Sequence, residues 1–538
     1  MQGLLIVTAV SIALVTFLNF TAAYRPCAPR ESPGAQTHVC VCNSSYCDDL
    51  PSVGSVTPGR AVVFTSTLSG KRLQRTELLL ETSQIGNESV VKLVVDLNVL
   101  HQRIMGFGGC FTDTTIINMN MTSSATQDAL INSYFGLNGS QLTLGRIPMA
   151  STDFASHIYS YDDVPGDFNL SYFSLSPEDI NYKIPMIRKA NALLPADHQL
   201  KLFISPWSAP AWMKTSGKMQ GAGTLKGAPG GQYHKTWAKY FVKTLDAYTA
   251  ENISIWGLTI ENEPTAGYQA LYTFQAMGFN ASTERDFIAV DLGPALHAGG
   301  HSDKVVMICD DQRFLVPQFA DYILTYPESA KYVSGIALHW YGDVYSPIQS
   351  LDYTHSMHPA HFMLNTEATN GALPWEIPGV VLGSWHRAQK YAKHILDDIN
   401  HWVSGWMDWN FAVDLNGGPS WVGNRADAQI VVNASGDEFL KQPMYYAMAH
   451  FSKFVRPGVY RIKQELTPLP DQNMFTEITA SSFVDPATGN IIVILLNSDS
   501  ENPRTVHVAQ AFTEDNTKSS LVLNMEPSSI QTVIWKTA

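Results

Sequence analysis

Two glutamates in this chain follow short apolar runs of the kind that form buried strands. Glu263 stands in Ile-Glu-Asn-Glu-Pro and Glu367 in Leu-Asn-Thr-Glu-Ala. In a barrel of parallel strands, the carboxyl ends of all strands face the active site. Two carboxylates that meet there could cleave a glycosidic bond, because one can attack the anomeric carbon while the other transfers the proton. We therefore predict that Glu263 is an acid/base and Glu367 a nucleophile.

A single glutamate at a strand end is more often a surface residue or an ion-pair partner. The residue types at the other predicted strand ends favour catalysis, because aromatic rings pack on sugars and Asp and Asn bind hydroxyl groups. Asn262 could bind the sugar 2-hydroxyl, and Arg146 and Tyr341 could bind the nucleophile by charge-assisted hydrogen bonds. The remaining candidates at these strand ends are Asp153, Trp207, His339 and Trp409.

Alternating strand-like and helix-like segments predict how these residues are positioned. Eight apolar runs, most of them separated by helix-like stretches, are typical of a closed (β/α)8 barrel, here over residues 103–457. The clearest helix covers residues 234–251, where apolar residues recur every three or four positions. The glutamates follow the fourth and seventh runs. The runs are residues 103–107, 142–149, 202–207, 253–260, 304–309, 333–339, 362–366 and 404–409.

The two ends of the chain show a different pattern. Residues 55–102 contain β-like apolar runs, and helix signals vanish after about residue 458, where 491–496 is a continuous apolar run. We expect residues 55–102 and 458–538 to form one all-β sandwich domain beside the α/β barrel. Residues 24–54 are too few to hold a core alone, so this cysteine-rich β segment should be stapled onto its neighbours.

The N-terminus predicts export. Residues 4–18 are apolar and uncharged, and Thr-Ala-Ala precedes Tyr24, which together indicate a signal peptide over residues 1–23. A membrane anchor is the alternative, because no basic residue precedes the run. The run is shorter than the about 20 residues that span a bilayer.

Cysteine usage agrees with export. Four cysteines cluster between residues 27 and 47, where disulfides fit an oxidising compartment and zinc binding is the alternative. Of the three pairings that four cysteines allow, we favour the adjacent one, Cys27 with Cys40 and Cys42 with Cys47. Cys110 and Cys309 are isolated, and we expect both to be buried free thiols.

Eight Asn-x-Ser/Thr triplets follow the predicted signal peptide. A single triplet is common by chance, but eight in an exported chain predict some surface glycosylation. The acceptors are Asn43, Asn87, Asn120, Asn138, Asn169, Asn252, Asn280 and Asn433.

The net charge of −13 argues against nucleic acid as a partner, since phosphate binding needs a surplus of Lys and Arg. The 16 histidines could change this balance in acid. Full protonation near pH 5 would bring the net charge to about +3, and attraction to anionic lipid would then become available. The alternative is that this histidine content is only a mild enrichment.

The chain resembles the animal lysosomal glucosylceramidases (acid β-glucosidases), a family in the clan of barrel glycosidases with carboxylates on strands four and seven. The matching segments run almost from end to end. They are Arg-Pro-Cys at 25, Val-Cys-Val-Cys-Asn at 39, Gly-Phe-Gly-Gly at 106, Ser-Pro-Trp at 205, Asn-Glu-Pro at 262, Asp-Asp-Gln-Arg at 310, His-Trp-Tyr at 339, Asp-Trp-Asn at 408 and His-Phe-Ser-Lys-Phe at 450.

The resemblance implies a lysosomal retaining β-glucosidase that hydrolyses glucosylceramide to glucose and ceramide by double displacement. It places the acid/base on Glu263 and the nucleophile on Glu367, and it needs no metal or organic cofactor. It also implies a glycosphingolipid substrate, an anionic membrane surface, a saposin-type activator and a lysosomal sorting receptor as partners. The enzyme would reside in the lysosome lumen and associate peripherally with membranes there. The glucose contacts that it implies are Asp153, Trp207, Asn262, Trp409 and Asn424.

Some features depart from the family. Relatives commonly have Phe-Ala-Ser-Glu-Ala around the nucleophile, whereas this chain has Leu-Asn-Thr-Glu-Ala. The rim segments 267–279 and 369–378 are less alike, and their aromatic residues either form an apolar lip or serve ordinary packing. Three alternatives therefore stay open: a related secreted β-glycosidase with another sugar or aglycone, extracellular residence, and a catalytically silent carrier or receptor-binding protein on the same fold.

Overall fold

The computed structural model describes residues 24–81, 90–195, 200–467, 477–511 and 520–536. The predicted signal peptide and the acceptor Asn87 lie outside these ranges. None of the helices within them combines the length and hydropathy that crossing a bilayer requires.

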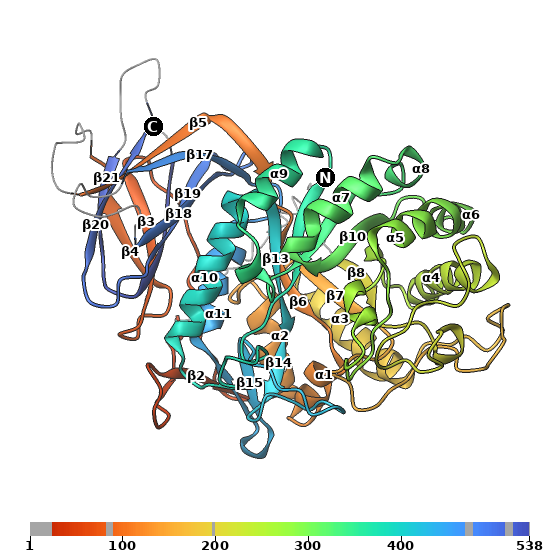
Figure 1. Cartoon of the computed structure of the whole chain (residues 1–538). Helices are drawn as coiled ribbons and strands as arrows, with labels where there is room; N and C mark the ends of the chain where they lie inside the picture. The colour runs from red at the N-terminus through yellow and green to blue at the C-terminus, as the bar shows by residue number, and fades with distance from the viewer. Residues whose placement is uncertain (1–23, 82–89, 196–199, 468–476, 512–519, 537–538) are drawn as a thin grey trace, which may run out of the picture.

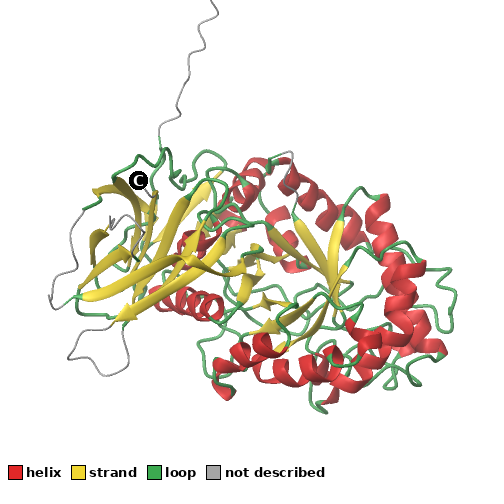
Figure 2. Cartoon of the chain, turned by 90° about the horizontal axis from the view of Figure 1, so that it is seen from above, coloured by secondary structure: helices red, strands yellow, loops and turns green. Residues whose placement is uncertain are grey.

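Eight parallel strands close into a barrel in chain order (Figure 1). Figure 2 shows these strands inside a ring of helices, with a separate sheet beside them. The predicted (β/α)8 barrel is confirmed. Its strands are β6 (Gly106–Cys110), β7 (Leu144–Met149), β8 (Lys201–Pro206), β9 (Ile255–Thr259), β10 (Val305–Gln312), β11 (Gly335–His339), β12 (Phe362–Glu367) and β13 (Val403–Asn410).

The barrel interior is a packed core. Six of its strands each contribute one fully buried apolar side chain to a cluster of their own, which closes the interior to solvent as expected for such barrels. Polar side chains gather instead toward and beyond the carboxyl ends of the strands, as Arg146 of β7 and Glu367 of β12 do. The members of the cluster are Leu144, Phe203, Met307, Ala337, Leu364 and Met407.

The first barrel strand differs from the prediction. Residues 103–107 do not form one strand, because Arg103 ends β5 (Val91–Arg103) and β6 begins only at Gly106. Gly106 has φ +134°, and a Cβ atom there would lie 2.2 Å from Thr143 Oγ1. Only glycine fits this position, so the chain turns there between two strands of different sheets.

Helices cover the outside of the barrel. The predicted helix over residues 234–251 is α4 (Gln232–Ala250), whose buried face carries Trp237, Tyr240, Phe241 and Leu245. The other helices are α1 (Asp113–Asn120), α2 (Ser124–Phe135), α3 (Ile184–Ala192), α5 (Ala281–Phe287), α6 (Gly293–Ala298), α7 (Val316–Leu324), α8 (Pro327–Ala330), α9 (Gln349–Met357), α10 (Trp385–Asn400) and α11 (Pro443–Ser452).

The two chain ends form one nine-stranded sheet, which confirms the all-β domain built from both ends. β5 lies between β17 and β20, so an N-terminal strand is central to a mostly C-terminal sheet. A hydrophobic cluster separate from the barrel core holds this sheet together. Besides β5, its strands are β3 (Arg60–Thr67), β4 (Gln74–Leu79), β17 (Tyr460–Thr467), β18 (Ile478–Val484), β19 (Asn490–Asn497), β20 (Arg504–Gln510), β21 (Ser520–Met525) and β22 (Ser529–Lys536).

The cysteine-rich segment joins a third sheet. Its strand β2 pairs with β16, so a hairpin that follows the barrel completes the sheet. The disulfides Cys27–Cys40 and Cys42–Cys47 confirm the predicted pairing, and Cys110 and Cys309 are buried free thiols. The strands of this sheet are β1 (Pro29–Arg30), β2 (Val39–Asn43), β14 (Ala412–Asp414), β15 (Ile430–Asn433) and β16 (Glu438–Lys441).

The predicted glycosylation acceptors fall into two groups. Asn43 and Asn433 are half-buried and hydrogen-bonded to neighbouring residues. The other described acceptors are exposed, and glycosylation stays a prediction for all of them. The exposed acceptors are Asn120, Asn138, Asn169, Asn252 and Asn280.

A buried ion cluster supports the barrel after its first strand. Lys183, the last residue of the π-helical turn η1 (Asp179–Lys183), lies 3.0 Å from Asp113 and 3.3 Å from Asp179. All three side chains are almost fully buried. Asp113 begins α1, so the cluster ties η1 to the segment that follows β6.

Removing the cation of this cluster should destabilise the fold. We expect Lys183→Met to lower the free energy of unfolding by about 3–5 kcal/mol, because two carboxylates would remain buried without a partner. Lys189→Met, which removes an exposed pair with Asp128 at 2.7 Å, should cost less than about 1 kcal/mol. Guanidinium unfolding followed by tryptophan fluorescence measures both, and equal losses would contradict the structural role of Lys183.

Candidate active site

The barrel places both glutamates at the same face. Glu367 is the last residue of β12, the seventh strand, and Glu263 lies just beyond β9, the fourth strand. Glu263 has φ +43° and ψ +59°, a left-handed conformation that costs a non-glycine residue on the order of 1–3 kcal/mol. Such strain at a polar residue in a cleft is typical of functional sites.

The two carboxylates lie close together. One oxygen of Glu263, one oxygen of Glu367 and a ring nitrogen of His339 all lie within 4.8 Å of one another. Retaining glycosidases hold their two carboxyl groups about 5–5.5 Å apart, and inverting enzymes about 6.5–9.5 Å apart. The arrangement therefore fits attack by one carboxylate on a sugar, without room for a water molecule between sugar and carboxylate.

A fully buried cation holds Glu367 in place. Arg146, on β7, donates a hydrogen bond from Nη1 to one oxygen of Glu367, and the Tyr341 hydroxyl donates to the other at 2.9 Å. Nη2 of Arg146 donates to Asn262 Oδ1 at 2.8 Å and to Asp310 Oδ2 at 2.7 Å. Arg146 thereby fixes three groups around the site at once.

Asp310 owes its position to a β-bulge. Between β10 and β11, Cys309 pairs with Ala337 and Asp311 with Leu338, so Asp310 is an extra residue without a register partner. Cys309 and Asp310 both have positive φ. Bulges of this kind re-aim side chains beside active sites. The bulge turns Asp310 toward Arg146 and toward His339, whose Nε2 lies 3.1 Å from Asp310 Oδ1.

Glu263 has its own set of hydrogen-bond donors. Gln312 Nε2 donates to Glu263 Oε1 at 2.8 Å, and the Tyr272 hydroxyl lies 3.3 Å from Oε2. His339 Nδ1 lies 3.2 Å from the same Oε1. His339 therefore bridges Glu263 and Asp310 with its two ring nitrogens.

Two buried cations, Arg146 and His339, lie among the acids of the site. Burial lowers the pKa of His339, but Glu367, Asp310 and Glu263 raise it to about 10, so the ring carries a charge at neutral and acid pH. Burial raises the pKa of Glu367, and His339 and Arg146 limit the rise by stabilising the anion. Burial acts the same way on Asp310, but Arg146 and His339 hold its pKa well below its usual range.

A cavity of about 920 Å³ opens above these groups. Trp207 and Trp409 line it with ring centroids 5.0 Å apart, and Asn424 donates to Asp153 at 2.9 Å on its wall. Burial first, and then Glu367 and Glu263, raise the pKa of Asp153 to about 7. The cavity offers aromatic faces and hydrogen-bonding groups together, as a pyranose requires.

The structure brings together the site residues that the sequence suggested. Glu263, Glu367 and the five suggested glucose contacts line the cavity together with Tyr341, while Arg146 and His339 lie buried and bind these acids. Sequence reasoning did not single out Asp310 or Gln312. Both stand in the Asp-Asp-Gln-Arg segment at 310, whose acidic run at a strand end was the available signal.

The site also has the donor types of a metal centre. Of the groups with metal-binding geometry among the described residues, two contain disulfide sulfurs, and the third is Glu263, His339 and Glu367. Both nitrogens of His339 and both oxygens of Glu367 already have hydrogen-bond partners. This set therefore fits a hydrogen-bonded carboxylate pair better than an ion.

Comparison with known proteins agrees with this geometry. The family model described as Glycosyl hydrolase family 30 TIM-barrel domain matches residues 104–455. A Caenorhabditis elegans relative named as a glucosylceramidase is 42% identical over 533 residues, 98% of this chain and 99% of its own length. Lysosomal acid glucosylceramidase of Mus musculus is 42% identical over 92% of this chain and 94% of its own length.

Among solved structures, SrfJ from Salmonella typhimurium superposes with a TM-score of 0.79 at 25% identity, covering 89% of this chain and 100% of that chain. The family model covers only residues 104–455, so a superposition over 89% of this chain extends beyond the barrel into the sheet domain. The chain is therefore a glycoside hydrolase of family 30 and belongs to its glucosylceramidase group.

Proposed function

We propose that the protein is a lysosomal retaining β-glucosidase that hydrolyses glucosylceramide to glucose and ceramide. The observation that carries this proposal is the pair of carboxylates at the fourth and seventh strand ends, with oxygens within 4.8 Å, beneath a cavity of about 920 Å³ with room for a sugar and part of its aglycone. The 42% identity to the mouse lysosomal enzyme supports the choice of substrate and compartment.

In the first step, Glu367 attacks the anomeric carbon and Glu263 protonates the departing oxygen of ceramide. Arg146 and Tyr341 bind the two oxygens of Glu367 and so aim the carboxylate. The product is a glucosyl ester on Glu367, and the electron pair of the broken bond leaves with the ceramide oxygen, which takes the proton of Glu263.

In the second step, Glu263 takes a proton from water, and that water attacks the ester carbon. Esterification has removed the negative charge of Glu367, which favours the ionised form of its neighbour. Gln312 and Tyr272 donate hydrogen bonds to Glu263 and stabilise it as a base. Glucose leaves with the configuration it had in the substrate.

Glucose would lie against Trp207 and Trp409, with hydroxyl groups bound by Asp153 and Asn424. Arg146 occupies the amide oxygen of Asn262, so the amide NH2 group is left to donate to the 2-hydroxyl. This contact can strengthen in the transition state, because the hydroxyl becomes more acidic as positive charge develops on the ring.

The rim of the cavity supports an apolar aglycone. Tyr272, Phe274, Leu373 and Pro374 line the cavity, and Trp375 next to them is 59% exposed. The same proposal includes docking of this rim on an anionic membrane surface and delivery of lipid by a saposin-type activator. It also includes a lysosomal sorting receptor as a partner.

The proposed domains are the cysteine-rich segment of residues 24–54, the sheet domain of 55–102 with 458–538, and the barrel over 103–457.

Buried carboxylic acids suit an acid compartment. Burial raises the pKa of Asp408 to about 7 and of Glu284 to about 8. Glu284 accepts a hydrogen bond from Cys309 N at 3.1 Å, while its other oxygen has no partner. Asp408 and Glu284 are therefore neutral in the folded protein at lysosomal pH, and neither adds a buried negative charge that the fold would have to stabilise.

The role assignment predicts different losses for the two glutamates. Glu367→Gln should reduce hydrolysis of every β-glucoside by about a thousandfold or more, because no nucleophile remains. Glu263→Gln should retain the first step for dinitrophenyl β-glucoside, whose leaving group needs no proton. Burst kinetics measure the rate of the first step, and mass mapping of an epoxide inhibitor adduct identifies the nucleophile. Equal loss of the first step in both variants, or a label away from Glu367, would overturn the assignment.

The substrate is tested by comparing sugars and aglycones. We expect at least about a tenfold higher kcat/KM for glucosylceramide than for galactosylceramide, because an axial 4-hydroxyl would meet Asp153 and Trp207. Soluble β-glucosides of non-lipid alcohols serve as the aglycone control. Equal rates on both ceramides would favour a related β-glycosidase, and inactivity on all of them with unreacted inhibitor would favour a silent carrier.

Glu284 predicts how stability depends on pH. The folded protein keeps this proton up to pH about 8, while an unfolded glutamate loses it near 4.5, so the contribution of Glu284 to stability falls as pH rises between these values. Glu284→Gln stays neutral at every pH. From pH 5 to 8 the native protein should therefore lose about 3 kcal/mol relative to this variant.

Guanidinium unfolding at pH 5, 6.5 and 8 measures the difference between the native protein and Glu284→Gln. The matched control is Glu328→Gln on α8, an exposed residue paired with Lys331. A difference that does not change with pH would show that Glu284 is ionised in the folded protein.

A further inference from the structure

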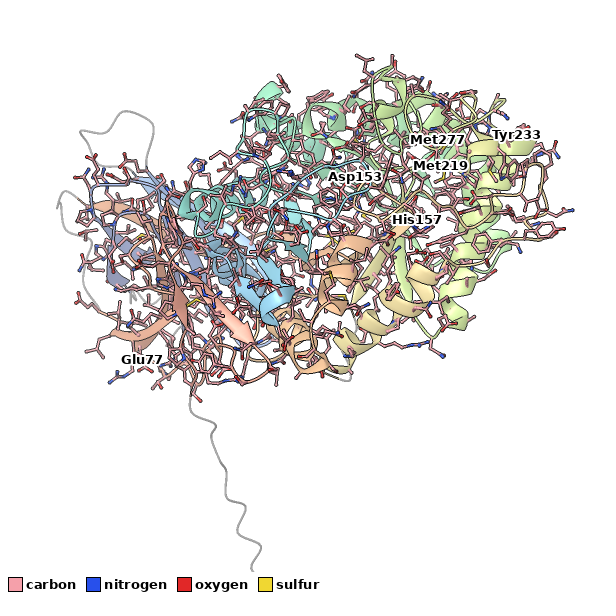
Figure 3. The ribbon with its side chains drawn as sticks, turned by 90° about the horizontal axis from the view of Figure 1, so that it is seen from below. Glu77, Asp153, His157, Met219, Tyr233 and Met277 are labelled. Carbon is pink, nitrogen blue, oxygen red and sulfur yellow. A yellow bond between two sulfur atoms is a disulfide. The ribbon has the colours of Figure 1, made fainter. Side chains whose placement is uncertain are left out.

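A second cavity, of about 900 Å³, lies between the cysteine-rich segment and the turn from β3 to β4. It shares no lining residue with the active-site cavity. In Figure 3, Glu77 of β4 lies at the sheet-domain end of the molecule, well away from Asp153 in the barrel. Arg75, which lines the second cavity, binds Glu77 at 2.9 Å. The two cavities are therefore separate sites.

The second cavity is electropositive. Lys71, Arg72, Arg75 and His38 line it, and no Asp or Glu of the described part of the chain does. This composition is unusual for a chain with a net charge of −13. Lys71 and Arg75 pair with Glu526 and Glu77, but both acids are part-exposed and lie outside the lining. A cavity with cations and no anions on its wall favours a negatively charged ligand.

Arg72 is the most deeply buried of these cations. It is 6% exposed, and its Nη atoms donate to the backbone oxygens of Thr67, Lys71 and His38 and to the Thr37 hydroxyl. No carboxylate in the described ranges forms an ion pair with it, and its Nε has no hydrogen-bond partner. Burial lowers its pKa to about 10. The Tyr446 ring, whose centroid lies 5.6 Å from the Arg72 guanidinium carbon, and the charge of Asp48 beyond ion-pair distance stabilise this cation only in part. An anion in the cavity would stabilise it further.

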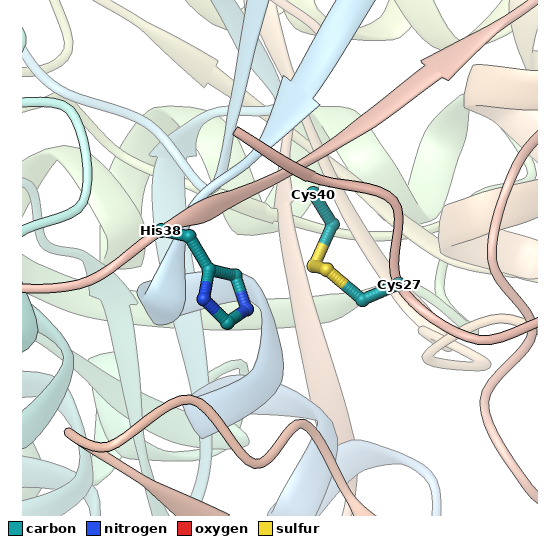
Figure 4. A group of neighbouring side chains, drawn as sticks. All are labelled: Cys27, His38 and Cys40. Carbon is teal, nitrogen blue, oxygen red and sulfur yellow. A yellow bond between two sulfur atoms is a disulfide. The ribbon is translucent and has the colours of Figure 1, made fainter. Parts of the chain in front are cut away.

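Prolines and a disulfide give part of the wall an apolar character, and Ser52, Ser69 and Gln74 add polar groups. Tyr24, Pro26, Pro29 and Pro51 line the cavity together with Cys27, which forms a disulfide with Cys40. Figure 4 shows the His38 ring beside this disulfide. Burial and then Arg72 lower the pKa of His38, as expected for an imidazole on an electropositive wall. Predicted cleavage after Ala23 would add the α-amino group of Tyr24 as a further cation.

We propose that this cavity binds a small amphiphilic anion, a phosphate or carboxylate headgroup with a short apolar body. The headgroup would lie against Lys71, Arg72 and Arg75, and the apolar body against the proline-rich wall. Because the wall comes from two parts of the chain, the ligand would also tie the cysteine-rich segment to the sheet domain and raise the unfolding temperature of the protein.

Calorimetric titration with octyl phosphate tests the proposal. The active site is first blocked with a covalent epoxide inhibitor, so that only other sites report. Inorganic phosphate and octanol are the matched half-ligands. We expect one octyl phosphate per chain, bound at least about tenfold more tightly than either half-ligand. Octyl phosphate that binds no more tightly than octanol would overturn the proposal.

The double variant Lys71→Gln with Arg75→Gln locates the site. Both side chains are part-exposed, so the unfolding temperature without ligand and the rate on a soluble β-glucoside should not change. Octyl phosphate should bind this variant at least about tenfold more weakly. Lys463→Gln, an exposed cation on the same sheet, is the control and should bind normally. Native affinity in the double variant, or an equal loss in the control, would contradict the site.

The source of the anion is distinguished by competition. Vesicles of phosphatidylcholine with phosphatidic acid are added to the complex with octyl phosphate, and vesicles of phosphatidylcholine alone serve as the reference. Displacement by the acidic vesicles alone identifies a membrane headgroup as the ligand. Retention of octyl phosphate in both identifies a free small molecule.

Discussion

A single buried guanidinium connects five strands of the barrel. Arg146 on β7 binds Ser205 on β8, Asn262 beyond β9, Asp310 on β10 and Glu367 on β12. Each partner is almost fully buried, and Arg146 supplies a hydrogen-bond donor to each of them. One of these partners is Glu367, a carboxylate that lines the active-site cavity. The geometry of the reaction therefore depends on the charge balance of the interior rather than on the surface of the cleft.

Two irregularities of the backbone position the acids that take part in this charge balance. A regular strand β10 would turn Asp310 to the other face, and the bulge at Cys309 and Asp310 corrects its direction. Glu263 similarly adopts a left-handed conformation just beyond β9. Both deviations cost free energy, which the packed barrel interior and the surrounding helices offset. Strain is thus concentrated where side chains must meet at fixed distances.

Much of the fold could be predicted because its signals are local. Eight apolar runs identify the strands, and the two glutamates follow runs whose order in the chain is their order in the barrel. The predicted start of β6 was wrong because the φ of Gly106 depends on the close approach of Thr143, the residue just before the next strand. Asp310 was missed for a related reason. A bulge is a property of register between neighbours, and no periodicity within one strand reveals it.

Burial gives the interior a dependence on acidity that a surface site would not have. Asp153 lines the sugar cavity with a pKa raised to about 7, so it is a hydrogen-bond donor in acid and a third negative charge beside Glu263 and Glu367 in base. His339, whose pKa is about 10, keeps its charge across the same range. At acid pH His339 therefore keeps its positive charge, while Asp153 becomes neutral and no longer adds a negative charge to the site. This combination favours a glycosidase that binds neutral sugar and works below neutral pH, and it follows from burial of the same groups that hold Glu367.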